Sequence, residues 1–122
     1  MKQPMQTAEE IVGNVATLFI LEPRLDAARG TQLKDLVRRM VGEGHRSIVL
    51  DLSRVEFVDS TGLGAIVSSR KLVHGGGDLV LAGVSGSVLA LFQLTRMDKV
   101  FALYSSRMEA IQAIAAKPWT VS

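Results

Sequence analysis

The alternation between short apolar runs and helical periodicity is the feature that most constrains the fold of this chain. Nearly uninterrupted apolar runs occupy residues 47–52, 79–82 and 100–104. Runs of this length without regular polar alternation are typical of strands buried on both faces of a sheet. Segments with helical spacing separate them, and strands joined through helices tend to run parallel. The sequence therefore predicts an α/β fold.

The N-terminal part of the chain predicts a β-hairpin followed by a helix. Residues 5–12 and 15–21 flank Gly13-Asn14, a two-residue turn that tolerates positive φ. Because hairpin strands are antiparallel, the sheet is expected to be mixed. The helix is expected over residues 27–41, and glycines at its end stop it. Its apolar residues recur at i, i+3, i+4 and i+7 and are Leu33, Leu36, Val37 and Met40.

Two further helices are expected in the C-terminal part of the chain. One covers residues 85–94 with Ser85 as its N-cap, and the other begins at a capping box formed by Ser106 and Glu109. The apolar stripe of the last helix is Met108, Ile111 and Ile114. The helix at 85–94 is apolar nearly all round, which is compatible with burial on two sides or with an exposed partner patch. The pattern predicts a mixed sheet of about five strands covered by about four helices, without fixing the strand order.

The length of 122 residues corresponds to one domain. Hydrophobic residues make up 48% of the chain and the mean hydropathy is +0.26, which argues against intrinsic disorder. We therefore expect a single domain over residues 1–122, with a packed core at 5–116 and a loose C-terminal tail at 117–122.

Charge and composition exclude several classes of function. The formal net charge is +2 and no Lys/Arg block exceeds two residues, whereas proteins that bind nucleic acid concentrate positive charge. The longest apolar stretch, 15–21, is far below the roughly 20 residues that cross a bilayer. No apolar signal segment follows Met1, and cysteine is absent. We expect a cytoplasmic protein without direct nucleic-acid binding, membrane insertion or a Cys-based metal site.

The segment 48–64 is the most informative about function. It runs from a buried strand, through a short polar connection, to the hydroxyl pair Ser60 and Thr61, where helical periodicity begins. One of these hydroxyls is expected to be the N-cap of the helix. Gly62 and Gly64 are poor helix formers in the first turn, and each costs up to about 1 kcal/mol relative to Ala. Close approach by another molecule would favour these glycines more than folding alone would.

A helical wheel divides this helix into two faces. Leu63, Ile66 and Val67 form the face expected to point to the core. The opposite face is small and weakly polar and consists of Thr61, Gly64, Ala65, Ser68 and Leu72. A smooth face beside a modifiable hydroxyl suggests a docking surface, although a neighbouring element of the same domain could also pack there.

The motif Asp59-Ser60-Thr61-Gly62-Leu63-Gly64, after a strand and at a helix start, resembles the hallmark of the STAS domain of bacterial anti-sigma factor antagonists. The resemblance extends over nearly the whole chain. Leu25-Asp26, the turn at Gly75-Gly76-Gly77 and the serine-initiated helices at 85 and 105 lie where that family has them. Glu22-Pro23-Arg24 departs from the family, in which a Gly-containing turn is more usual. The resemblance implies a single STAS-type domain.

The resemblance also implies a phosphorylation-controlled binding protein without a cofactor, and not an enzyme. In the family, the first hydroxyl after the Asp is phosphorylated by a partner that is both an anti-sigma factor and a serine kinase. This position is Ser60 here, with Thr61 as the alternative acceptor. The unphosphorylated antagonist binds the anti-sigma factor and frees the sigma factor, and a PP2C-type serine phosphatase restores that state. Together with the outward helix face, the implied partner-binding residues are Asp26, Asp59, Ser60, Thr61, Gly62, Leu63, Gly64, Ser68 and Leu72.

Two alternatives use the same fold: a non-phosphorylated STAS subunit of a membrane transport system, and a partner-switching antagonist whose output is not transcription. An enzyme is disfavoured because the sequence has no Gly-Lys-Ser/Thr phosphate loop and no Gly-x-Ser-x-Gly elbow. The motif at 59–62 has no second copy that could form the carboxylate dyad of an aspartic protease. His45 and His74 are too isolated for a metal site or a catalytic triad.

Overall fold

The computed structural model describes residues 3–73 and 77–116. The expected tail at 117–122, His74 and the first two glycines of the turn at 75–77 lie outside the described residues. In chain order the described elements are β1 (Thr7–Val12), β2 (Val15–Ile20), β3 (Arg24–Leu25), α1 (Ala27–Gly42), β4 (Ser47–Asp51), β5 (Phe57–Val58), α2 (Ser60–Leu72), β6 (Asp78–Ala82), α3 (Gly86–Leu94), the 3-10 helix η1 (Met97–Lys99), β7 (Leu103–Tyr104) and α4 (Arg107–Ala115).

The main sheet is mixed and has the order β1-β2-β4-β6-β7, which confirms the predicted fold class. β1 and β2 form the expected antiparallel hairpin, in which Gly13 adopts a φ of 58°. The pairs β2–β4, β4–β6 and β6–β7 are parallel. A second sheet, which the sequence did not predict, consists of the two-residue strands β3 and β5 in parallel.

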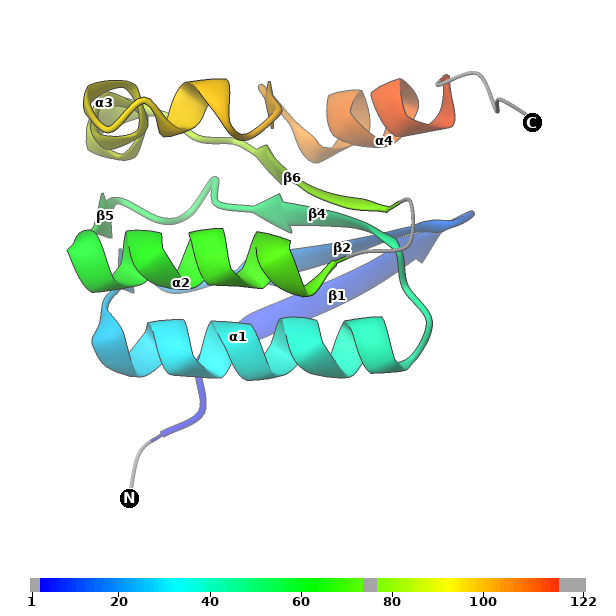
Figure 1. Ribbon diagram of the computed structural model, residues 1–122, viewed down its shortest axis with the longest axis horizontal. Coiled ribbons are helices and arrows are strands. Elements are labelled where there is room, and N and C mark those ends of the chain that lie inside the picture. The colour runs from blue at the N-terminus through cyan, green and yellow to red at the C-terminus, as the bar shows by residue number, and fades with distance from the viewer. Residues whose placement is uncertain (1–2, 74–76, 117–122) are drawn as a thin grey trace.

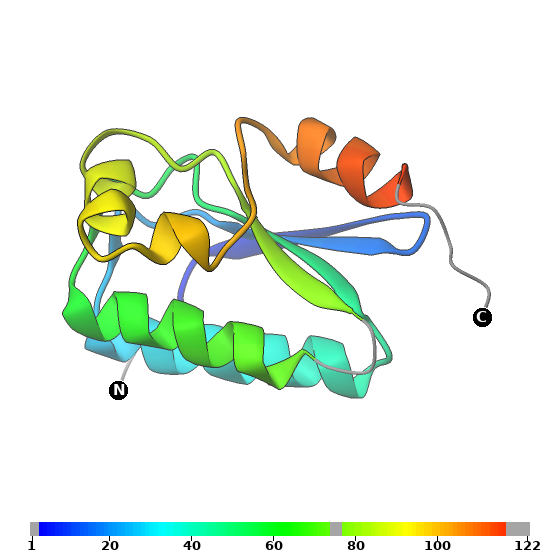
Figure 2. The ribbon, with the colours of Figure 1, turned by 45° about the horizontal axis from the view of Figure 1, so that its top comes forward.

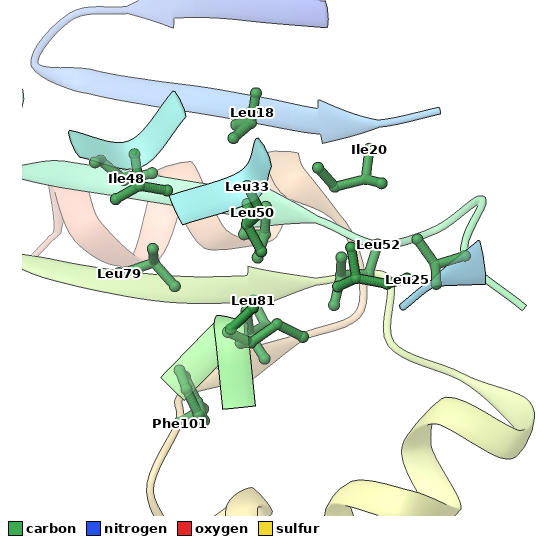
Figure 3. Packing of buried hydrophobic residues seen from close by; sticks show 14 of the residues in the cluster. Leu18, Ile20, Leu25, Leu33, Ile48, Leu50, Leu52, Leu79, Leu81 and Phe101 are labelled. Carbon is green, nitrogen blue, oxygen red and sulfur yellow. The ribbon is translucent and has the colours of Figure 1, made fainter. Parts of the chain in front are cut away.

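Helices cover both faces of the main sheet (Figures 1 and 2). α1 and α2 lie side by side on one face, and α4 packs on the other. Successive side chains of a strand point to opposite faces. Ile48 and Leu50 of β4 therefore join the core under α1 and α2, while Val49 joins a second core with Ala110 and Ile111 of α4. Figure 3 shows the larger core. This two-sided burial explains the apolar run predicted at 47–52.

α1 and α2 approach each other closely at a small-residue contact. A Cβ built on Gly30 would lie 2.8 Å from the Cβ of Ala65. Ala65 is accordingly 5% exposed, so its predicted place on the outward face of α2 is wrong. The helix that covers this residue belongs to the same domain, as the alternative reading of that face allowed. Ser69 of α2 is buried as well.

The C-terminal third departs from the sequence prediction in several details. The strand expected at 100–104 is confined to Leu103–Tyr104, because η1 precedes it and Phe101 packs edge-on against Phe92 in the core. Ser85 occupies the N-cap of α3, yet its side chain forms no capping hydrogen bond. Burial of α3 is one-sided: Val88 and Phe92 are buried, while Leu94 is 84% exposed.

α4 begins as predicted, with one difference in its capping box. The Ser106 hydroxyl accepts a hydrogen bond from the backbone N–H of Glu109 at 3.2 Å. The Glu109 carboxylate accepts from the Ser105 hydroxyl and not from the Ser106 backbone, so only half of the box forms. The expected stripe also loses one member, because Met108 is exposed while Ile111 is buried.

Candidate functional site

The candidate site lies where α1 and α2 begin, at the same end of the molecule (Figure 1). β3 leads directly into α1 and β5 leads into α2, and the two strands pair in parallel. The pairing continues one residue further, since the N–H of Asp59 donates to the Leu25 carbonyl at 3.3 Å. This short sheet therefore brings Asp26, the residue after β3, to the same edge as the start of α2.

Asp59 is the N-cap of α2, so the prediction that Ser60 or Thr61 caps this helix is wrong. The backbone of Asp59 is extended and its Oδ1 accepts a hydrogen bond from the N–H of Gly62 at 2.8 Å. A carboxylate is favoured at this position because it pairs a full negative charge with free N–H groups and with the helix dipole. Ser60 is consequently the first residue of the helix.

The two hydroxyls at the start of α2 are in different situations. The Thr61 hydroxyl donates a hydrogen bond of 2.6 Å to Asp59 Oδ1. Ser60 is exposed, and within the described residues its hydroxyl forms no hydrogen bond. A reagent that approaches Ser60 therefore meets an unengaged oxygen, whereas reaction at Thr61 would first break its contact with the capping carboxylate.

Asp59 carries its negative charge over a wide pH range. The hydrogen bond from the Thr61 hydroxyl holds the pKa of this carboxyl below its ordinary value, and the bond from the Gly62 N–H adds to the effect. The positive charge of Arg24 acts in the same direction. The unmodified helix start therefore already holds one anion, next to the free hydroxyl of Ser60.

The two glycines of the first turn serve different purposes. Gly62 is buried, and a Cβ built on it would lie 2.1 Å from the carbonyl oxygen of Leu25. The small size of Gly62 is therefore required by contact with β3, and not by an external partner as the sequence had suggested. Gly64 is exposed, and a Cβ on it would meet nothing within 4 Å. Folding alone gives no reason for a glycine at position 64.

The remaining residues predicted to bind a partner are distributed unevenly. Ser68 is exposed on α2, in line with the expected outward face. Leu63 and Leu72 are half-buried and pack against the core, so the predicted place of Leu72 on the outward face of α2 is wrong. Asp26 has a structural role: it is the N-cap of α1, and it accepts from the N–H of Arg29 at 3.1 Å and pairs with the Arg29 guanidinium at 3.0 Å.

Sequence reasoning missed two residues at this site, Arg24 and Phe57. The Arg24 guanidinium lies 5.0 Å from the centroid of the Phe57 ring, and Phe57 is 44% exposed. Both belong to the two-residue strands, in which Leu25 and Val58 point inward and are buried. The available signal was this in–out alternation on either side of α1, which is too short to stand out in a sequence.

The described residues contain no group of three His, Cys, Asp or Glu side chains that could hold a metal ion. Over the same residues, no helix combines the length and the apolar character that a membrane span requires.

The fold and the site together define a small α/β domain with a mixed sheet, in which the helix capped by Asp59 presents the exposed hydroxyl of Ser60. The family model of the STAS domain matches residues 6–110, so this chain belongs to the STAS domain family. The resemblance carried by the motif at 59–64 is thereby confirmed.

Two named relatives are similar to this chain over much of its length. An anti-sigma F factor antagonist of Paenibacillus polymyxa is 29% identical over 98 residues, which cover 75% of this chain and 84% of the relative. An anti-sigma-B factor antagonist of Staphylococcus aureus is 33% identical over 72 residues, which cover 58% of this chain and 67% of the relative.

Solved structures share the fold. An anti-sigma factor antagonist from Mycobacterium paratuberculosis superposes with a TM-score of 0.82 and 22% identity, covering 91% of this chain and 94% of that one. The Bacillus cell fate determinant SpoIIAA in its phosphorylated form gives a TM-score of 0.68 and 20% identity, covering 89% and 99%. A sulfate transporter family protein from Wolinella succinogenes superposes with a TM-score of 0.74 and 17% identity, covering 87% of this chain and 88% of that one. The same fold thus occurs in antagonists and in transport proteins.

Proposed function

We propose that this chain is an anti-sigma factor antagonist that binds an anti-sigma factor with serine kinase activity, and that phosphorylation of Ser60 breaks this complex. The observation that carries the proposal is the free, exposed hydroxyl of Ser60 at the start of α2, beside the bound hydroxyl of Thr61. The antagonist names of the relatives support the general role. We infer Ser60, and not Thr61, as the acceptor because of this difference in hydrogen bonding.

The chemistry is a phosphoryl transfer that the partner catalyses. The Ser60 oxygen bonds to the γ-phosphorus of ATP, the bond to the β,γ-bridging oxygen breaks, ADP leaves, and the serine proton passes to a base of the kinase. A PP2C-type phosphatase would hydrolyse the phosphoester and restore the hydroxyl. This chain supplies only the acceptor and the surface on which the kinase docks.

The physical basis of the switch is a change of surface without a change of fold. A phosphate adds about −1.5 to −2 charges, and the N–H groups and dipole at a helix N-terminus tolerate such a charge. The docking surface changes much more, because a neutral hydroxyl becomes a hydrated dianion next to the ionised Asp59. Burying that dianion against a partner that offers no cation opposite it would weaken binding by several kcal/mol.

The docking surface in this proposal centres on the exposed part of α2 beyond Ser60. Gly64 and Ser68 are exposed there, and the open space over Gly64 lets a partner approach the helix backbone. Asp26, Leu63 and Leu72 stay in the proposed surface as flanking residues, although each also has a role inside the domain.

The transport-system alternative rests on the shared fold with the Wolinella protein. It predicts a permanent contact through the same surface and no modification of Ser60. A partner-switching antagonist with an output other than transcription would keep every structural feature of the proposal and differ only in what its partner controls.

Mass spectrometry after incubation with the candidate kinases tests the proposal. The purified chain is mixed with ATP and, separately, with each anti-sigma factor kinase encoded in the same genome. We expect a phosphate on Ser60 that is absent in Ser60→Ala and retained in Thr61→Ala. Transfer to Thr61, or no transfer with any of these kinases, would contradict the proposal, and the second result would favour the transport alternative.

A further inference from the structure

The outward side of the β3–β5 sheet places a cation next to the start of α2. Arg24 is paired with Phe57, and Leu25 with Val58. Leu25 and Val58 point into the core, so Arg24 and Phe57 face outward. The backbone of Asp59 is still extended, so its side chain falls on the same side as Phe57, two residues earlier. Arg24 and the helix cap therefore share one face of this short sheet.

β3 is held firmly against β5 at this point. The carbonyl oxygen of Pro23 accepts hydrogen bonds from the N–H groups of both Glu56 and Phe57, at 2.8 and 3.0 Å. Contact with the Phe57 ring, 5.0 Å from the guanidinium carbon to the centroid, orients the side chain of Arg24. The ring occupies the face of the guanidinium and leaves its N–H groups available to an acceptor.

Arg24 differs from Arg29, another arginine near this end of the molecule. Arg29 is engaged by two carboxylates, with Glu22 at 3.1 Å and Asp26 at 3.0 Å. Within the described residues Arg24 forms no direct ion pair: its guanidinium lies over the Phe57 ring, and its charge acts on Asp59 at longer range. An oriented guanidinium without a direct ion pair thus lies on the same face of the short sheet as Asp59. Ser60, whose hydroxyl forms no hydrogen bond within the described residues, is the next residue in the chain.

We propose that Arg24 is the internal counter-ion of the phosphate on Ser60. This inference rests on the proposed function, because it takes Ser60 as the residue that carries the phosphate. A guanidinium can donate two parallel hydrogen bonds to phosphate oxygens, which a single ammonium cannot do.

The charges around α2 show why such a counter-ion is needed. The charged residues on the elements that surround the helix start are Arg24, Asp26, Arg29, Arg54, Glu56 and Asp59. Asp59 already accepts the N–H of Gly62, so a phosphate on Ser60 would compete with it for the same helix end and repel it. Arg24 offsets that repulsion and keeps the modified helix start intact.

Phosphoserine incorporated at position 60 through an expanded genetic code tests the inference without any kinase. Phosphorus NMR then follows the second ionisation of the phosphate in the full chain at about 0.15 M ionic strength. That ionisation occurs near pH 6, and we expect Arg24→Gln to raise the phosphoserine pKa by about half a unit relative to the unsubstituted chain. Arg24→Lys should retain part of the effect, because it keeps the charge and loses the paired donors.

Lys71→Gln is the matched control. Lys71 is exposed and lies on the same helix, 11 residues after Ser60 and therefore about 16 Å along its axis. We expect this variant to leave the phosphoserine pKa unchanged. An unchanged pKa in Arg24→Gln, or an equal shift in Lys71→Gln, would overturn the inference.

The result is independent of the kinase experiment. If Arg24→Gln shifts the pKa but no kinase modifies Ser60, the counter-ion is supported and the proposed function fails. If a kinase modifies Ser60 and Arg24→Gln has no effect, the proposed function stands and the counter-ion is overturned. Far-UV circular dichroism of Arg24→Gln checks that the fold is kept, and Arg24→Lys gives the same test should Arg24→Gln not fold.

Discussion

Alanine substitutions at Gly62 and Gly64 should have opposite effects on stability, although the two residues lie in the same turn of α2. In Gly62→Ala the new methyl group would lie 2.1 Å from the Leu25 carbonyl oxygen. That oxygen cannot easily retreat, because it also accepts the N–H of Asp59 and belongs to the paired strand β3. In Gly64→Ala the methyl group would meet nothing within 4 Å.

The magnitudes follow from two opposing terms. Replacing a helical glycine with alanine gains about 0.5–1 kcal/mol at either position. At position 62 this gain is outweighed by an overpacking cost of about 1–3 kcal/mol, and a backbone obstacle places the cost at the upper end. We therefore expect Gly62→Ala to lose about 1–2 kcal/mol of unfolding free energy, and Gly64→Ala to gain up to about 1 kcal/mol.

Urea denaturation followed by circular dichroism measures both values against the unsubstituted chain. The two variants should move the midpoint in opposite directions with similar m-values, since neither changes the surface exposed on unfolding. Equal stability of Gly62→Ala and the unsubstituted chain, or a loss of stability in Gly64→Ala, would refute the reasoning from these distances. Weaker kinase binding by a stabilised Gly64→Ala would further show that this glycine serves the partner.

Three other substitutions test separate parts of the structure. Ser60→Asp should weaken binding to the anti-sigma factor in calorimetry and leave the melting temperature nearly unchanged; a large fall in melting temperature would contradict a switch that acts only on the surface. The pKa of Asp59 in the folded chain is below its ordinary value of 3.8. The contribution of the ionised carboxylate to the unfolding free energy is therefore complete above pH 3.8 and is lost as the pH falls through the folded pKa. The difference in unfolding free energy between Asp59→Asn and the unsubstituted chain should accordingly close in acid. Gly30→Val should lower the unfolding free energy by about 1–3 kcal/mol, and with it the urea midpoint, since its Cβ would lie 2.8 Å from that of Ala65. An unchanged midpoint would show that α1 and α2 can separate freely.

The elements that were predictable from the sequence are those whose burial repeats along the chain. α1 spans Ala27–Gly42 against an expected 27–41, and β4 spans Ser47–Asp51 against 47–52. The hairpin turn at Gly13 was predictable because its chemistry is local. Repeated contact with one core imposes a period on the sequence, and that period can be read without coordinates.

The strand at 100–104 shows where this reasoning fails. Val100 and Phe101 are as apolar as the residues of a buried strand, but Val100 is 43% exposed and Phe101 reaches the core from outside the sheet. An apolar run records burial and not the element that achieves it, so the 3-10 turn before this run left no distinct pattern.

At the candidate site, the sequence by itself located the hydroxyl pair, the start of the helix and the outward position of Ser68, since these depend on neighbours in the chain. Only the tertiary structure showed that Asp59 is the N-cap, that the Thr61 hydroxyl donates to Asp59, and that the Ser60 hydroxyl forms no hydrogen bond within the described residues. The need for glycine at position 62 comes from Leu25, a residue remote in sequence, through a pair of two-residue strands. Contacts of that kind produce no periodic pattern in the sequence, because a single close approach between two distant backbone segments restricts the size of one residue and not of every residue on one face of a helix or strand.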